Sequence, residues 1–192
     1  MDPINIIIGI NIIATFGANF SAAGKGIKSK LSQVTSRPAT YLQNTPLYLA
    51  TLILLSQILG VFQLGTFEYT TSLDALRITA LIFYLCFSWI QIKIMKTLGD
   101  SYSQEIVIKK NHLLVTKGFY GYVRHPFYLS QIITDLSAGI ALLSWIVLPL
   151  AIIQIPLLML RAKKEDEIFE KYFKEEFKNY KKKTGFIFPY IG

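Results

Sequence analysis

Long uncharged apolar segments alternate with basic segments along this chain. Residues 4–22 and 46–66 contain no charged residue, and residues 73–95 carry charges only near their ends. A helix needs about 20 apolar residues to cross a hydrocarbon core of roughly 30 Å. These three segments are therefore predicted to be membrane-spanning helices.

A fourth apolar stretch, residues 127–160, is long enough for two shorter spans. Ser144 and Trp145 lie near its middle, where we expect the chain to turn, so the two spans should pair as a tight antiparallel hairpin. Pro149 and Pro156 fall in the returning arm, which predicts a kinked helix. The whole pattern predicts an all-α polytopic membrane protein with five transmembrane helices in a single domain, residues 1–192.

The composition supports this interpretation, since 52% of the residues are hydrophobic and only 17% are charged. Such a chain is too apolar for an ordinary soluble domain. Residues 1–22 lack a basic beginning, so we expect them to remain as a span rather than to be cleaved as a signal peptide. Cys86 is the single cysteine and excludes an internal disulfide. His112 and His125 have no cysteine or paired carboxylate at metal-ligand spacing, so no metal site is expected.

Basic residues gather in the connections predicted to lie on one side of the membrane. Nineteen of the 20 Lys and Arg residues fall in residues 23–45, 93–126 and 161–183. Cytoplasmic loops of membrane proteins are enriched in these residues. We therefore predict that the N-terminus lies outside and the C-terminus lies in the cytoplasm. The one-sided charge suits an anionic lipid surface, and no nucleic-acid-binding module is present to account for it.

Residues 99–126, here called the connector, form a long connection between the third and fourth spans. Connections of this length are often functional. The runs EIVIKK and HLLV within the connector suit short extended segments. After the fifth span, aromatic residues recur at helical spacing over residues 168–180, which predicts a C-terminal amphipathic helix against the membrane or the connector.

Two polar clusters flank the predicted hairpin. Arg124, His125 and Pro126 precede it, and Arg161 and Glu165 follow it at a spacing of four residues. A headgroup anchor would explain the first cluster alone, and a surface ion pair would explain the second. Because the hairpin is short, however, both clusters should reach the same membrane surface, and this arrangement suggests an active site.

Asp135 falls near mid-membrane by residue count, where a carboxylate needs a partner. Two interpretations stay open. Asp135 lines a polar path with Ser130, Gln131 and Thr134, or it is protonated and hydrogen-bonded within the bundle.

The segment LVTKGFYGYVRHPFY, residues 114–128, resembles the signature LVTxGxYxxxRHPxY of the isoprenylcysteine carboxyl methyltransferase family. That family is related to membrane phospholipid methyltransferases. The run RAKKEDEIFEKYFKEEFKNYKKKTGFIFPY, residues 161–190, resembles the family's second pattern, R…EExxLxxxFGxEYxxY. Both blocks occur in order, with the apolar hairpin between them, and the resemblance covers about residues 100–192.

The resemblance implies an integral membrane enzyme that binds S-adenosylmethionine at the cytosolic face. It would methylate the carboxylate of an isoprenylated cysteine or a similar lipidic acid. Arg161 is implied as the catalytic and substrate-binding residue. Either Gln104 or Glu105 is implied to contact the cofactor; the complete implied set is Gln104, Glu105, His112, Leu113, Leu114, Val115, Tyr120, His125, Pro126, Phe127, Tyr128 and Glu165.

Three residues depart from the family pattern, because Asp166, Phe169 and Lys174 stand where the pattern has Glu, Leu and Gly. No GxGxxG motif follows a strand, so a Rossmann-type cofactor site is not expected. Three alternatives stay open: a phospholipid or lipid-amine N-methyltransferase, a non-enzymatic membrane scaffold, and a sterol reductase with a similar C-terminal hairpin. The natural acceptor, its lipid length and the oligomeric state are also open.

Overall fold

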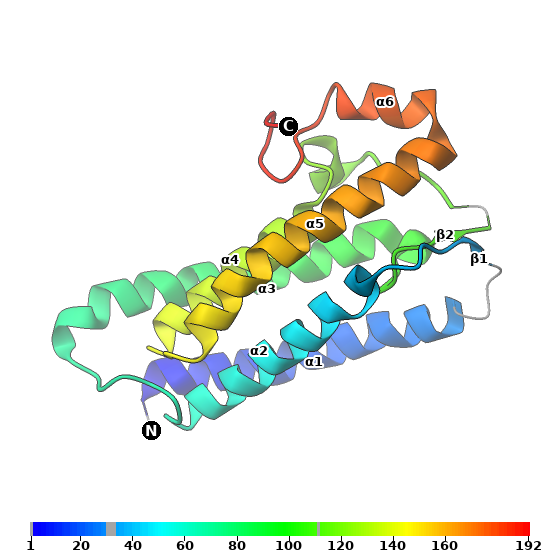
Figure 1. The fold of residues 1–192 in the computed structure, drawn as a ribbon. Helices are drawn as coiled ribbons and strands as arrows, with labels where there is room; N and C mark the ends of the chain where they lie inside the picture. Colours follow the sequence, from blue (N-terminus) through cyan, green and yellow to red (C-terminus); the bar gives the residue numbers. More distant parts are fainter. Residues whose placement is uncertain (1, 30–33, 111) are drawn as a thin grey trace.

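The computed structural model of the protein describes residues 2–29, 34–110 and 112–192, and it is mostly helical (Figure 1). Its elements are α1 (Pro3–Ser29), β1 (Val34–Ser36), η1 (Tyr41–Gln43), α2 (Thr45–Val61), η2 (Thr71–Leu73), α3 (Asp74–Leu98), η3 (Gly99–Ser101), β2 (Ile108–Lys109), η4 (Gly118–Gly121), α4 (Pro126–Ala141), α5 (Val147–Phe173) and α6 (Glu175–Lys181), where η denotes a short 3₁₀ helix.

The long helices α1 to α5 coincide with the apolar segments predicted as spans. By length and apolar composition, two segments among the described residues are able to cross a membrane, Tyr41–Val61 and Thr71–Leu98; Pro3–Ala18 is a shorter apolar helix. Large apolar side chains such as Ile13 and Trp89 point outward and are 77% and 52% exposed. An apolar outer surface of this kind suits lipid. The helices point to an integral membrane protein, whereas five spans and their orientation stay predictions.

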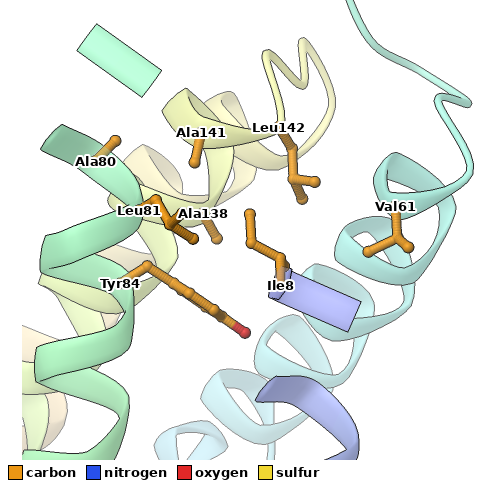
Figure 2. Packing of buried hydrophobic residues seen from close by; sticks show 8 residues of the cluster. All are labelled: Ile8, Val61, Ala80, Leu81, Tyr84, Ala138, Ala141 and Leu142. Carbon is orange, nitrogen blue, oxygen red and sulfur yellow. The ribbon is translucent and has the colours of Figure 1, made fainter. Parts of the chain in front are cut away.

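Side chains from α1, α2, α3 and the end of α4 pack together in the bundle. Figure 2 shows Ile8, Val61, Tyr84 and Leu142 among the side chains that point toward one another. Burial of these apolar groups stabilises the bundle. Gly139 lets the hairpin arms approach closely, because a Cβ there would lie 3.1 Å from the backbone nitrogen of Leu148.

The turn predicted at Ser144 and Trp145 is confirmed, since it lies between the end of α4 and the start of α5. The Ser144 amide donates to Gly139 at 2.8 Å, and Ser144 pairs with Thr66 of the α2–α3 connection. The N-terminus lies at this end of the bundle, and the connector and α6 lie at the other (Figure 1).

The predicted all-α class is confirmed as a mostly helical fold, with one short sheet at the connector. β1 and β2 form a two-stranded antiparallel sheet that pairs Val34 with Lys109 and Ser36 with Ile108. β2 lies in the EIVIKK run, as expected for an extended segment. The sheet forms because the extended backbone of the connector finds hydrogen-bond partners in the α1–α2 connection.

The predicted C-terminal amphipathic helix is not a separate element that begins after the fifth span. α5 continues from Val147 to Phe173 with Pro156 inside it, and the chain changes direction only at Lys174. Lys174 has φ 50° and ψ −120°, a conformation that favours glycine. α6 follows, and beyond it Ile187 packs against Tyr128, Leu158 and Ala162 of the hairpin.

Candidate active site

A cavity of about 540 Å³ opens between the helices and the connector. Its volume falls in the range of small-molecule sites, roughly 300–1,000 Å³. His125 and Tyr128 line it from the start of α4, and Arg161 and Glu165 line it from α5. The hairpin therefore brings the two polar clusters together, as its short turn predicted.

Arg161, Tyr128 and Glu165 form the centre of this site. The Arg161 Nε atom donates to the Tyr128 hydroxyl at 2.9 Å, and that hydroxyl donates to Oε1 of Glu165 at 2.5 Å. The same Glu165 oxygen lies 3.5 Å from Arg161 Nε. The tyrosine hydroxyl thus joins an arginine and a carboxylate within the cavity wall.

The network continues from Glu165 to Arg124. His125 Nδ1 lies 3.5 Å from Glu165 Oε2, and His125 Nε2 lies 2.8 Å from Asp166 Oδ1. The second Asp166 oxygen accepts from Arg124 Nε at 3.1 Å. Arg124 also donates to the Thr184 carbonyl at 2.7 Å, so the network anchors the C-terminal segment beside the site.

The charges around His125 and Glu165 stabilise each other's ionised forms. Burial lowers the pKa of His125, but its hydrogen bonds to Asp166 and Glu165 outweigh burial and raise that pKa above 6.5. Burial likewise raises the pKa of Glu165, but His125 and Arg161 outweigh it and bring the pKa below 4.5. The pair therefore favours an imidazolium beside a carboxylate.

The other donors of Arg161 hold main-chain segments from outside the hairpin. Nη1 donates to the carbonyls of Leu42 and Gln43 at 3.2 and 3.3 Å. Nη2 makes a short hydrogen bond to the carbonyl of Gln104. Arg161 is only 4% exposed, so it joins η1 and the connector to α5 from a buried position.

Most residues implied as cofactor contacts surround the cavity or a smaller neighbouring one. The main cavity is lined by Gln104, Glu105, His112, Tyr120, His125, Phe127, Tyr128 and Glu165. Leu113, Leu114 and Val115 line a side pocket of about 40 Å³ that shares His112, Tyr120 and His125 with the main one. Pro126 lines neither pocket and begins α4 instead, where its missing N–H costs little.

Gln104 and Glu105 differ in their contacts. Gln104 offers its carbonyl to Arg161, whereas the Glu105 carboxylate accepts from Arg37 at 3.2 Å. Both residues line the cavity.

His112 presents an unpaired ring atom to the cavity. Its Nδ1 atom is buried and has no hydrogen-bond partner among the described residues. The ring packs against Phe169 and Phe173 at centroid distances of 5.6 and 6.0 Å. Burial lowers the pKa of His112 to about 4, so the ring is neutral at neutral pH and suits a polar ligand better than an anionic one.

Sequence reasoning missed two residues of the site. Asp166 bridges His125 and Arg124, and its position beside Glu165 in the family's acidic pair was the available signal. Gln43 is 5% exposed; its amide accepts from the Ile106 amide at 2.8 Å and donates to the Ile106 carbonyl at 3.0 Å. No motif pointed to Gln43, because its role depends on how the connector packs against the α1–α2 connection.

Asp135 combines features of both interpretations left open by the sequence. Its Oδ1 accepts from Gln57 at 3.0 Å and its Oδ2 accepts from Gln131 at 3.4 Å, so it is hydrogen-bonded within the bundle. It also lines the cavity together with Gln131 and Thr134. Ser130, which donates to the Phe127 carbonyl at 2.8 Å, is not part of that lining.

The segment that contains the hydrogen-bonded network of this site matches a known protein family. The model of the isoprenylcysteine carboxyl methyltransferase family matches residues 80–171, from the middle of α3 almost to the end of α5. The resemblance to this family is confirmed. The match starts earlier and ends earlier than the motif region predicted over residues 100–192.

Two individual proteins extend this family comparison. Protein-S-isoprenylcysteine O-methyltransferase of Schizosaccharomyces pombe is 29% identical over 117 residues, which cover 59% of this chain. That alignment covers 50% of the yeast protein. A solved structure of the eukaryotic intramembrane Ras methyltransferase of the family matches 100% of this chain and 69% of its own, with TM-score 0.63 and 18% identity. At that identity the likeness concerns the fold.

Proposed function

We propose that this protein transfers a methyl group from S-adenosylmethionine to the carboxylate of a lipidic acid, with isoprenylated cysteine as the acceptor class that its relatives suggest. The observation that carries the proposal is the hydrogen-bonded network from Arg161 through Glu165 to Arg124, which lies within the family-matched segment at the cavity.

The cavity residues fit the chemistry of this cofactor. Bound there, S-adenosylmethionine supplies an electrophilic methyl group on a sulfonium. The faces of Tyr120 and Tyr128 would attract a cation. Glu165 and His125 would bind hydroxyl or amino groups, and the unpaired Nδ1 of His112 would accept or donate one further hydrogen bond.

The acceptor side requires positioning rather than proton removal. A carboxylate is already ionised at neutral pH, so methyl transfer to it needs no general base. Arg161 would orient it, because a guanidinium holds a carboxylate at fixed geometry and keeps its charge. The Nη atoms of Arg161 carry four N–H groups, and three of these bind carbonyls, so a bidentate acceptor carboxylate would displace at least one carbonyl.

The lipid chain would enter sideways from the bilayer between the helices, since its apolar carbons gain nothing by crossing water. In this proposal the site lies at the cytoplasmic face, with the N-terminus outside. The concentration of basic residues in residues 23–45, 93–126 and 161–183 supports that orientation.

A methyl-transfer assay tests the proposal. Protein in phospholipid nanodiscs receives methyl-labelled S-adenosylmethionine with N-acetyl-S-farnesylcysteine, octadecanoic acid or phosphatidylethanolamine. We expect base-labile methyl esters on a carboxyl acceptor. If phosphatidylethanolamine is the single acceptor that becomes labelled, on its nitrogen, the result would instead support a lipid-amine methyltransferase. If the protein neither transfers label nor binds S-adenosylhomocysteine, the result would support a non-enzymatic scaffold.

Arg161→Lys and Arg161→Ala examine the acceptor role. We expect both to lower kcat/KM by about 100-fold or more, because a bidentate contact is lost. Calorimetry should show S-adenosylhomocysteine binding largely retained. Lys163→Ala, an exposed change two residues away on α5, is the matched control. Unchanged turnover in the Arg161 variants would remove Arg161 from the mechanism.

A further inference from the structure

The cavity contains a second polar layer that the proposed reaction does not use. Gln57 from α2, Asp135 from α4 and Gln154 from α5 line it within the helices. Gln154 is 0% exposed, and neither its amide nitrogen nor its amide oxygen has a hydrogen-bond partner among the described residues. An unpaired amide in this position is costly unless a ligand or water satisfies it.

The position of this layer relative to Arg161 follows from helix geometry. Gln154 precedes Arg161 by seven residues on α5, and Asp135 follows Tyr128 by seven residues on α4. Seven residues make about two turns, so each pair lies on one helix face with an axial separation of about 10 Å. Because Arg161 bonds Tyr128 at 2.9 Å across the antiparallel hairpin, Gln154 and Asp135 share one depth.

The chemistry of the layer does not suit a plain hydrocarbon. Gln57 donates to Asp135 at 3.0 Å, Gln131 donates to Asp135 at 3.4 Å, and Gln91 donates to Gln131 at 3.3 Å. These hydrogen bonds join the four side chains into a polar wall. Among the buried side chains that the structure describes, Gln154 keeps both a free donor and a free acceptor. An isoprenyl chain at this depth would leave that amide unpaired, whereas a hydroxyl, carbonyl or amide group would satisfy it.

We infer that the lipidic acid bound in this cavity carries a hydrogen-bonding group about 10 Å from its carboxylate, and that Gln154 binds this group. The inference deepens the proposed function and rests on it for the carboxylate's place at Arg161. It narrows the proposed acceptor from lipidic acids in general to those that carry such a group along the lipid chain.

Binding of matched acids to the full chain in nanodiscs tests this inference without relying on turnover. Calorimetry compares 9-hydroxyoctadecanoic acid with octadecanoic acid, and 2-hydroxyoctadecanoic acid serves as the positional control. We expect the 9-hydroxy acid to bind at least about tenfold more tightly than the other two, because a site that hydrogen-bonds a ligand group discriminates against ligands that lack it.

Gln154→Met keeps the side-chain length and removes the amide. We expect it to bring the affinity ratio of the 9-hydroxy acid to octadecanoic acid close to one while octadecanoic acid still binds. Thr79→Val, a polar-to-apolar change at an exposed site of α3 that is outside the cavity lining, should preserve the ratio.

A ratio near one in the unmodified protein would overturn the inference and indicate that water occupies the layer. An unchanged ratio in Gln154→Met, or binding of none of the three acids, would also overturn it. The labelled-methyl assay reports on the proposed function separately. Methylation of farnesylcysteine without hydroxy-acid preference would defeat the inference alone, whereas hydroxy-acid preference without any methyl transfer would defeat the proposed function alone.

Discussion

The guanidinium of Arg161 and the hydroxyl of Tyr128 meet across the α4–α5 hairpin, with 2.9 Å between Nε and the oxygen. The same hydroxyl donates to Glu165 at 2.5 Å. One phenol group therefore fixes both the proposed acceptor residue and a proposed cofactor residue, and it sets the register of the two helices at the site.

Tyr128→Phe removes this shared hydroxyl and keeps the ring. We expect the variant to lose roughly 1–3 kcal/mol of stability, because Arg161 and Glu165 each lose a buried hydrogen bond. Methyl transfer should fall about 10- to 100-fold as the two residues lose their orientation. Thermal unfolding and the labelled-methyl assay measure the two effects. Tyr122→Phe, at an exposed position of the same motif, should change neither quantity, and equal behaviour of the two variants would contradict the role of the hydroxyl.

Asp166→Asn tests the bridge between His125 and Arg124. Removing the charge leaves the buried Arg124 guanidinium without its carboxylate partner, so we expect a loss of about 3–5 kcal/mol in unfolding free energy. Asp166→Glu, which restores the family residue, should retain more of that stability. Glu167→Gln is the control, because the Glu167 side chain is 55% exposed and pairs with Lys164 at the surface. A loss as large in Glu167→Gln would show that the bridge is not responsible.

Lys174→Gly tests the break between α5 and α6. Lys174 has φ 50°, a conformation in which a side chain is strained and glycine is not. We expect the substitution to raise the unfolding free energy by about 1 kcal/mol. Lys171→Gly, inside α5, should instead lower it by about 1 kcal/mol. Destabilisation by both glycines would mean that the backbone at residue 174 is not strained.

The pH dependence of stability tests the coupling of His125 to its carboxylates. The pKa of His125 is raised above 6.5 in the folded protein, so its stabilising contribution is complete below 6.5 and is lost as pH rises through the folded value. The pKa of Glu165 is lowered below 4.5, so its contribution is complete above 4.5 and is lost as pH falls.

The difference in stability between the unmodified protein and His125→Gln should therefore be greatest between pH 4.5 and 6.5 and should shrink as pH rises through the raised pKa of His125. Thermal unfolding across that range measures it. A difference that grows with rising pH would require His125 to be stabilised in its neutral form.

The sequence alone determined where the long helices lie and which segments hold the candidate site residues. Uncharged apolar runs of the required length become helices because the backbone must satisfy its own hydrogen bonds away from water. The short run between Ala141 and Val147 forces a hairpin, and that constraint places Arg161 near His125. The family motifs identified the polar part of the cavity wall around His125 and Glu165 for the same reason, since the motifs lie at the two ends of this hairpin.

Only the tertiary structure decided the partners that come from distant segments. Arg161 binds carbonyls of Leu42, Gln43 and Gln104, and no local pattern encodes which carbonyl will face a given guanidinium. Asp166 lies between His125 and Arg124 because α5 continues past the site instead of ending there. Gln154 and Asp135 lie at the same level along the hairpin because of how α4 and α5 pack. The periodicity of one helix does not determine its alignment with the other.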